Sequence, residues 1–491
     1  MSIRVSRWSR LAIGLGVFYT LLTTAITWAE HATYNRTSLD LGVYTQLVWN
    51  MAHGRPFETT LLLQNRLHLA EHLALLLLPL GPLYGLVPDV RVLLLLEQAA
   101  LALSGLPVFW LARCRLGPRL GLVILACYYA MPVLADVALD GVYPIVFAAV
   151  PAGLAAALAL SGVRRTAAIS SLLALTFEEE AALLALGVGL YLLWFRPTAR
   201  GTAAVLLLAG GLWLGSAEGL VMPSFYQPTT SADETRAERH FSQLRENPAG
   251  WLQSVALYRL DPETLGALRL PRRVGQPTRC PEGGHCSALR WWLYPTAGLA
   301  LLSPPALLIA GPPAASLLLA DRPGRFRRHW ATPMLPVFWL AATLGLVRLA
   351  GRRRIRLAAV AALLGATLLM YHLDSSLPFG GQYDPGDIAG SALAADLSRL
   401  GARIPDGASV AASRRGLAHL ANRRELYVFP PKDYGPGLWP PPELPAYALL
   451  DLQNVDVVRD LESPTGSLRT DPPYRELART PNALLLQRSG P

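Results

Sequence analysis

The hydrophobic pattern of the first 372 residues consists of long apolar segments separated by short loops that carry arginine. Several of these segments approach the roughly 20 residues that an α-helix needs to cross a bilayer. They lie near 11–28, 91–112, 120–138, 144–162, 166–177, 181–195, 201–222, 290–303, 305–320, 331–348 and 357–371. The pattern predicts a polytopic α-helical membrane protein with about 11 transmembrane helices.

The distribution of arginine predicts the orientation of these helices. Arg4, Arg7 and Arg10 precede the first apolar segment, and no small-residue cleavage site follows it. Because cytoplasmic loops are enriched in basic residues, we expect the N-terminus in the cytoplasm of a bacterial cell. The protein would then be a multi-pass inner-membrane protein with external loops at 29–90 and 223–289.

The apolar run at 67–88 interrupts this alternation. It contains His68, Glu71 and His72 together with proline and glycine. If it crossed the bilayer, the basic loop at 113–119 would lie outside, against the positive-inside rule. We therefore expect this run to form interfacial or re-entrant helices that follow the first transmembrane helix.

Composition agrees with the membrane class. Hydrophobic residues make up 52% of the chain and charged residues 16%, and the mean hydropathy is +0.32. The net charge of +10 comes almost wholly from arginines in short loops. Such a distribution indicates contact with membrane lipids and orientation, and it speaks against nucleic-acid binding.

Residues 373–491 have the composition of a small soluble domain. The segment 388–400 predicts an amphipathic helix, and 416–421 predicts a further helical piece. Strands are predicted at 409–413, 425–429, 447–451 and 482–487. Alternating strands and helices predict an extracytoplasmic α/β domain beside the transmembrane domain 1–372. The domain has no glycine-rich phosphate loop and no nucleophile elbow, so the sequence assigns it no chemistry.

The segment Asn35–Gly54 is the first polar stretch after an apolar segment, and it predicts an amphipathic helix at the membrane surface. Asp40 stands where that helix would begin. Its carboxylate could cap the helix by accepting hydrogen bonds from free backbone N–H groups. It could also perform chemistry at the membrane surface. The residues leave both roles open.

Three other groups of polar residues are candidates for chemistry. Acidic residues at Asp136, Asp140 and Glu178–Glu180 are predicted at the outer surface, where ionisable groups near a bilayer are often functional. His68-Leu-Ala-Glu71-His72 matches the pattern of a zinc peptidase in which two histidines on one helix face hold the metal. That pattern is short, and no further ligand can be singled out.

The third group is a set of arginines predicted on the outer side, against the positive-inside rule. It consists of Arg322, Arg325, Arg327 and Arg328, with His329 beside them. Such a cluster predicts an anionic partner, either a phosphate or lipid headgroups and acidic side chains.

The cysteines Cys280 and Cys286 lie in the external loop, where an oxidising compartment permits a disulfide. A metal site with His285 is the alternative, although two thiols and one imidazole are not a recognised zinc spacing. We expect the disulfide.

The segment Leu39–Asn50, followed by Ala52-His-Gly54, resembles the signature of a bacterial membrane family known as domain of unknown function 2079 (DUF2079). The family's Lys-Glu-Asp element corresponds to Glu178–Glu180, and its Tyr-His-Tyr element to Arg328–Trp330. The lysine is here replaced by Glu178. Further matches are Glu71-His72, Leu77–Tyr84, Leu95–Ala112, Asp140–Pro144, Ser409–Ser413 and His419–Arg424. The resemblance covers most of the chain.

That family is in turn similar to the GT-C class of glycosyltransferases, which use polyprenyl-phosphate sugars as donors. The resemblance implies that Asp40 is the general base. It implies that Glu71, His72 or the pair Glu179 and Glu180 orient substrate or bind a divalent metal. The resemblance also implies that the outer arginines and His329 neutralise the departing phosphate. The full set of residues implied in substrate binding is Glu71, His72, Asp140, Glu179, Glu180, Arg325, Arg327, Arg328 and His329.

The competing interpretation is a transporter of lipids or sugar-lipids, or a scaffold for an envelope complex. Transporters often show internal repeats and charged residues near the bilayer midplane, and neither is evident here. The transferase interpretation makes a structural prediction. Asp40, Glu71, His72, Glu179 and Arg328 should converge on one outward-facing cavity.

Overall fold

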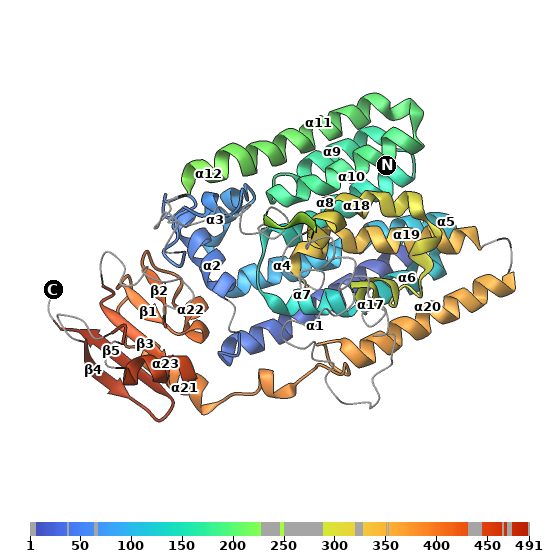
Figure 1. Ribbon diagram of the computed structural model, residues 1–491. Coiled ribbons are helices and arrows are strands. Elements are labelled where there is room, and N and C mark those ends of the chain that lie inside the picture. Colours follow the sequence, from blue (N-terminus) through green and yellow to red (C-terminus); the bar gives the residue numbers. More distant parts are fainter. Residues whose placement is uncertain are drawn as a thin grey trace.

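The computed structural model describes most of the chain as a helical bundle with a small α/β domain at one end (Figure 1). The described residues are 6–36, 39–62, 67–226, 246–249, 288–319, 328–349, 351, 353–430, 444–463, 466–468 and 474–489. Cys280, Cys286, Arg325 and Arg327 lie outside these residues, so the expected disulfide and two of the expected phosphate contacts stay predictions.

The apolar segments form the helices of the bundle. Their bounds are α1 (Arg7–Ala32), α4 (Val90–Ser104), α5 (Leu106–Leu116), α6 (Pro118–Tyr129), α7 (Pro132–Asp140), α8 (Pro144–Leu160), α9 (Arg164–Ala174), α10 (Ala182–Phe195), α11 (Arg200–Ser216), α12 (Met222–Phe225), α17 (Ala288–Leu293), α18 (Pro304–Leu319), α19 (Leu335–Arg348) and α20 (Arg353–Asp374). Short 3₁₀ turns include η2 (Glu179–Ala181), η7 (Leu299–Leu302) and η9 (His329–Met334).

Five of the described helical stretches are long and apolar enough to cross a membrane, and the number becomes six if the bent pair α6 and α7 is one span. The two helices of that pair meet at 50°. Pro132 at the start of α7 lacks the N–H that would continue α6, which explains the break. Helices such as α9 and α10 are shorter, with 11 and 14 residues. The predicted total of about 11 crossings stays a prediction.

Small residues let the central helices approach closely. α8 is rich in alanine and is buried along nearly its whole length. α10 packs against α18 at Gly187, where a Cβ atom would overlap the carbonyl oxygen of Ile309. Without a hydrophobic driving force between helices in lipid, such close backbone packing supplies much of the helix association.

Two segments after α1 lie between the bundle and the α/β domain. They contain α2 (Leu39–Ala52), η1 (His68–Ala70) and α3 (Leu77–Leu86). Ten residues of α-helix rise only about 15 Å, so α3 is too short to cross a bilayer. The expectation that 67–88 does not form a transmembrane helix agrees with this geometry.

The α/β domain contains a five-stranded sheet with the order β2-β1-β3-β5-β4. β1 (Val410–Ala412) pairs in parallel with β2 (Leu426–Val428) and with β3 (Tyr447–Asp451). β5 (Ala483–Arg488) runs antiparallel to β3 and to β4 (Tyr474–Arg479). The sequence predicted four of these strands. It missed β4 because this strand is at the sheet edge and has no buried face to impose an apolar alternation.

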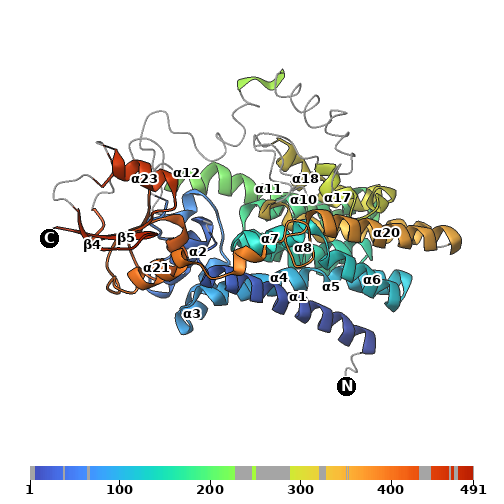
Figure 2. The same cartoon turned by 90° about the horizontal axis from the view of Figure 1, so that it is seen from below.

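Helices η10 (Pro385–Ile388), α21 (Ala392–Gly401), α22 (Arg414–Leu420) and α23 (Val455–Glu462) complete the domain. α22 packs against α2, and Figures 1 and 2 show the domain beside α2 from two directions. The Gln46 amide donates hydrogen bonds to the carbonyl oxygens of Arg423 and Arg424, at 3.3 and 3.1 Å. Tyr84 of α3 donates a bond of 2.8 Å to the side chain of Asn422.

This packing corrects the expectation that the amphipathic helix α2 exposes a polar face. Its polar residues Gln46 and Asn50 are buried like the apolar residues Leu41 and Leu47. The polar side chains are satisfied by neighbouring segments: the side chain of Asn50 donates to the carbonyl oxygen of Glu58 at 2.9 Å. The apolar and the polar faces of the amphipathic helix α2 thus both pack against other parts of the protein.

Candidate functional site

A polar pocket of about 540 Å³ lies where the bundle meets the α/β domain. Four parts of the chain form it: the end of α1 with the start of α2, the end of α7 with the segment before α8, the start of η9, and the α/β domain. Its lining residues are Glu30, Asn35, Arg36, Leu39, Asp40, Leu139, Asp140, Tyr143, Arg328, Asp387 and Arg414. Of the residues that the sequence singled out, Asp40, Asp140 and Arg328 meet here.

Asp40 lies in the first turn of α2 and reaches the pocket wall. Because α2 begins at Leu39, Asp40 is inside the helix and does not take the N-cap position that the sequence suggested. A carboxylate in a first helical turn is still favoured by the positive end of the helix dipole. Its Oδ2 accepts a hydrogen bond of 3.1 Å from the hydroxyl of Tyr143.

A charged cluster forms another part of the wall. Oδ1 of Asp140 accepts a hydrogen bond of 2.5 Å from Arg328, and Oδ2 lies 3.3 Å from Nδ1 of His329. Asp140 and His329 are largely buried, whereas 59% of the Arg328 side chain is exposed. The cluster therefore presents a guanidinium group that is anchored at one end and accessible at the other.

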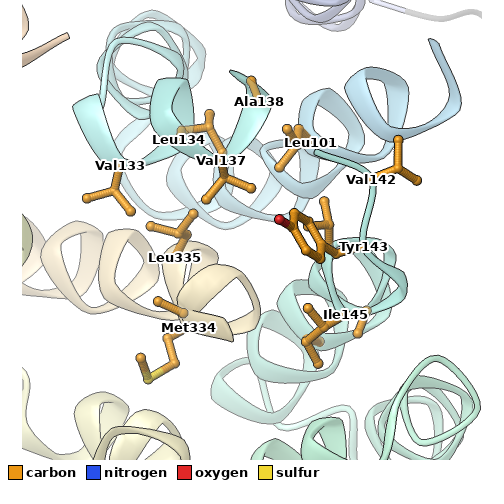
Figure 3. Close-up of a cluster of buried hydrophobic side chains, with 14 of the residues drawn as sticks. Leu101, Val133, Leu134, Val137, Ala138, Val142, Tyr143, Ile145, Met334 and Leu335 are labelled. Carbon is orange, nitrogen blue, oxygen red and sulfur yellow. The ribbon is translucent and has the colours of Figure 1, made fainter. Parts of the chain in front are cut away.

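Tyr143 joins Asp40 to this cluster. Its ring stacks on His329 with 3.4 Å between ring centroids. Its backbone N–H donates to Glu97 over 3.1 Å, which fixes the turn before α8. Figure 3 shows the ring among apolar side chains of α4, α7 and α8, such as Leu101 and Ile145. The sequence signal for Tyr143 was its place in the motif Asp140–Pro144, but its bond to Asp40 was not predictable.

Arg36 is a pocket residue that the sequence analysis missed. Its Nη1 forms an ion pair of 2.9 Å with Glu30, and only 3% of the side chain is exposed. Its Nε and Nη2 atoms are buried and have no hydrogen-bond partner among the described residues. A buried guanidinium with two unused donors is costly, so it fits an anionic group or ordered water.

The α/β domain contributes Arg414 and Asp387 to the pocket. The domain is held in place by Arg415, which donates to the carbonyl oxygen of Tyr34 at 3.0 Å. Asn35 in turn donates to the carbonyl oxygen of Asp387 at 2.7 Å. Partial burial raises the pKa of Asp387; nearby Asp384 adds to the rise and Arg415 opposes it. The sequence analysis assigned this domain no chemistry, because no local motif marks Arg414 and Asp387, which reach the pocket from a different part of the fold.

A second polar cluster lies apart from the pocket. Nδ1 of His72 is 3.0 Å from Oε1 of Glu178 and 3.1 Å from Oε1 of Glu179. The two carboxylates are almost fully buried. None of the predicted residues Glu71, His72, Glu179 and Glu180 lines the described pocket. Of the five residues expected to converge on one cavity, this pocket therefore brings together Asp40 and Arg328. Glu179 instead meets the segment after η1, where it accepts a hydrogen bond from the N–H of Leu73.

The zinc-peptidase arrangement does not form. The motif His68–His72 forms a three-residue 3₁₀ helix and a turn closed by a hydrogen bond of 2.9 Å from the His72 N–H to the His68 carbonyl oxygen, so it is a single turn and not part of an α-helix. Among the described residues, the group that could hold a metal contains His72, Glu178 and Glu179 and omits His68. Asp136 also lies away from the pocket, where it accepts a hydrogen bond of 3.0 Å from Ser376.

Tyr44 stands between the two clusters. Its ring meets Tyr143 edge-on at 6.0 Å and His68 at 5.3 Å, and His68 stacks on His72 at 5.5 Å. Burial raises the pKa of the Tyr44 hydroxyl, and the negative charges of Glu178 and Asp40 raise it further. A row of aromatic contacts thus joins the two clusters, although His72, Glu178 and Glu179 do not line the described pocket.

The sequence matches a family model over residues 30–434, and the family is described as predicted membrane protein (DUF2079). The chain belongs to this family. The membership confirms the resemblance drawn from Leu39–Asn50, and it confirms that this is a membrane protein. No curated protein matches the sequence.

Among solved structures, ArnT from Cupriavidus metallidurans bound to undecaprenyl phosphate is similar to this chain with a TM-score of 0.54. The two are 13% identical, and the match covers 99% of each chain. The Archaeoglobus fulgidus oligosaccharyltransferase in complex with Zn and sulfate is 14% identical with a TM-score of 0.49, over 89% of this chain and 67% of the other. The likeness to ArnT shows that this DUF2079 protein has a GT-C-like fold.

Proposed function

We propose that this protein is a membrane glycosyltransferase that moves a sugar from a polyprenyl-phosphate donor to an acceptor hydroxyl on the outer face of the membrane. The observation that carries the proposal is the pocket in which Asp40 lies together with Arg36, Arg328 and Arg414. A carboxylate that removes a proton and cations that hold a phosphate are the groups this reaction needs. The GT-C-like fold shared with ArnT, whose structure contains undecaprenyl phosphate, supports the lipid class.

Asp40 acts as the general base in this proposal. Its carboxylate takes the proton of the acceptor hydroxyl while the acceptor oxygen forms a bond to the anomeric carbon of the sugar. The bond between that carbon and the phosphate oxygen breaks on the opposite side, so the configuration is inverted. The hydrogen bond from Tyr143 orients the carboxylate and leaves its Oδ1 available for the proton.

The arginines act on the leaving group. The phosphate departs with the electron pair of the broken bond, so its negative charge grows in the transition state. Arg328 is anchored by Asp140 and exposed to the pocket, and Arg36 has buried donors without partners among the described residues. Arg414 approaches from the α/β domain. Charge-assisted hydrogen bonds of this kind are about twice as strong as neutral ones.

A transfer assay in proteoliposomes tests the proposal. The wild type and Asp40→Asn are incubated with labelled polyprenyl-phosphate sugars and membrane acceptors, and the labelled product is separated from the lipid donor. Loss of a general base lowers the rate by roughly 100- to 10,000-fold, so Asp40→Asn should transfer almost nothing. Asp456→Asn, on the α/β helix α23 and outside the described pocket, is the matched control.

Two outcomes contradict the proposal in different ways. Equal transfer by the wild type and Asp40→Asn removes Asp40 from the role of base. Tight binding of a polyprenyl phosphate without transfer of any sugar favours the transporter or scaffold interpretation.

A further inference from the structure

Two neighbouring polar side chains of α4 are buried inside the bundle. Glu97 and Gln98 are both 0% exposed, and they belong to a helical stretch that is long and apolar enough to cross a membrane. Polar side chains at such positions are costly to bury, and they usually have a function. Neither residue lines the described pocket. Any role in the pocket therefore acts through other residues.

The two side chains hold opposite ends of the turn that joins α7 to α8. Nε2 of Gln98 donates a hydrogen bond of 3.0 Å to the carbonyl oxygen of Ala138. Oε1 of Glu97 accepts one of 3.1 Å from the N–H of Tyr143. Successive residues of an α-helix point about 100° apart, so two adjacent side chains of one helix can contact both ends of a turn. Figure 3 shows Ala138 and Tyr143 near Leu101, which belongs to the same helix as the two polar residues.

This turn carries two residues of the pocket. Asp140 anchors Arg328, and Tyr143 donates a hydrogen bond to Asp40. Gly141 lies under the ring of Tyr143, since a Cβ atom at Gly141 would be 3.0 Å from that ring. The ring and the backbone of the turn are thus packed together. A shift of the turn therefore moves the hydroxyl that reaches Asp40.

Each of the two side chains uses only part of its hydrogen-bonding capacity. Oε2 of Glu97 and Oε1 of Gln98 are buried and have no hydrogen-bond partner among the described residues. A buried polar atom without a partner destabilises the folded state. A methionine would fill a similar volume without that cost. The geometry of the two hydrogen bonds therefore explains the pair better than a contribution to stability does.

We propose that Glu97 and Gln98 are positioning residues for two different parts of the pocket. Glu97 acts through Tyr143 on Asp40, the proposed base. Gln98 acts through the end of α7, where Asp140 anchors the arginine that holds the donor phosphate. This role in catalysis rests on the proposed function, whereas the two hydrogen bonds do not.

Transfer kinetics in proteoliposomes separate the two roles. Glu97→Met removes the acceptor of the Tyr143 N–H, so kcat should fall by about 10- to 100-fold with little change in the donor KM. Gln98→Met releases the end of α7, so the donor KM should rise several-fold with a smaller change in kcat. Glu97→Gln keeps an acceptor oxygen and should retain most of kcat. Ser104→Ala, which removes another buried polar group of α4, is the matched control and should behave as the wild type does.

Hydrogen exchange and thermal unfolding test the two hydrogen bonds without an assay of activity. The amide hydrogen of Tyr143 should exchange faster with solvent in Glu97→Met than in the wild type or in Glu97→Gln, because it has lost this acceptor. The melting temperatures of Glu97→Met and Gln98→Met should stay close to that of the wild type. Each substitution removes one hydrogen bond and one buried oxygen without a described partner, and these effects on stability have opposite signs.

Two kinetic outcomes overturn the proposal. Wild-type kcat in Glu97→Met is the first. The second is an equal change of kcat and KM in Glu97→Met and Gln98→Met together with lower melting temperatures, because it indicates a structural role of the whole helix.

A wild type that transfers no sugar contradicts the proposed function, and hydrogen exchange then decides on the hydrogen bond of Glu97. Faster exchange at Tyr143 in Glu97→Met supports the bond and removes only its role in catalysis. Unchanged exchange overturns the bond itself.

Discussion

The hydroxyl of Tyr143 donates a hydrogen bond of 3.1 Å to Oδ2 of Asp40, although 103 residues separate them in the chain. The ring of Tyr143 also stacks on His329, which contacts Asp140. One aromatic side chain therefore links the predicted base to the charged cluster that contains Arg328. The arrangement of the pocket depends on how the turn before α8 is held.

Tyr143→Phe should lower kcat of sugar transfer by about tenfold and leave the donor KM nearly unchanged. A hydrogen bond to a charged group contributes about 1.5–3 kcal/mol, and the phenylalanine ring keeps the stacking on His329. Steady-state kinetics in proteoliposomes measure both constants. Tyr474→Phe, in the edge strand β4, is the matched control. A KM effect without a kcat effect would indicate that Tyr143 binds donor and does not orient Asp40.

Arg36→Gln should weaken donor binding. The substitution keeps part of the side-chain volume but removes the charge and the guanidinium donors that have no partner among the described residues. We expect the donor KM to rise by roughly tenfold or more, since a charge-assisted hydrogen bond contributes about 1.5–3 kcal/mol. Titration of a non-transferable polyprenyl phosphate measures the same loss directly. Arg91→Gln, an exposed arginine paired with Asp89, should bind this ligand as the wild type does.

Arg414→Ala should reduce transfer although it lies in the α/β domain. Its side chain lines the pocket, so its loss removes one cation from the phosphate site. We expect a several-fold fall in kcat/KM, because each cation contributes about 1 kcal/mol or more to such a site. Arg403→Ala, at an exposed position of the same domain, should be close to the wild type. Equal kcat/KM in both variants would indicate that the α/β domain covers the pocket but contributes no cation to phosphate binding.

Gly187→Ala should destabilise the bundle. The new Cβ would overlap the carbonyl oxygen of Ile309 in α18, and a backbone atom cannot turn away as a flexible side chain can. Overpacking of this kind costs about 1–3 kcal/mol. Thermal unfolding in detergent should show a lower melting temperature. Gly211→Ala in α11, which has open space around its Cβ, is the matched control and should unfold as the wild type does.

Acidification should weaken the contact between α1 and the α/β domain through His419. This ring stacks on Tyr34 at 3.6 Å and on His31 at 3.9 Å. Burial lowers the pKa of His419 from 6.5 to about 3; His31 and Arg91 add to the fall, and Asp89 opposes it. Because the unfolded state takes up a proton below pH 6.5 and the folded state does not, stability falls as the pH drops from 6.5 towards 3.

The slope from His419 is up to about 1.4 kcal/mol per pH unit and disappears above pH 6.5. Melting temperatures measured between pH 8 and pH 5 should therefore be flat at first and then fall. In His419→Phe, which keeps a ring in the stack but does not titrate, the fall should be shallower. A profile that is identical in both proteins would assign the acid sensitivity to other groups.

The sequence by itself determined the membrane class, most of the helices and the presence of Asp40 near the start of a helix. Long apolar segments and arginine-rich loops are local properties, and the bilayer imposes helices on such segments whatever their neighbours are. Leu39–Asn50 was likewise sufficient to indicate the family. Four strands of the small domain were predictable because their buried faces leave an apolar pattern.

Only the tertiary structure decided which polar residues share a site. Arg36 and Arg414 have no distinctive local pattern, and the motif that contains Tyr143 does not indicate its partner. These residues share the pocket because the segment after α1, the segment before α8 and the α/β domain meet there. His72 was expected beside Asp40 but instead faces Glu178, because the turn at Glu178–Glu180 packs on the segment after η1. Contacts between residues far apart in the chain depend on the packing of whole elements, and that packing is not encoded in any single segment.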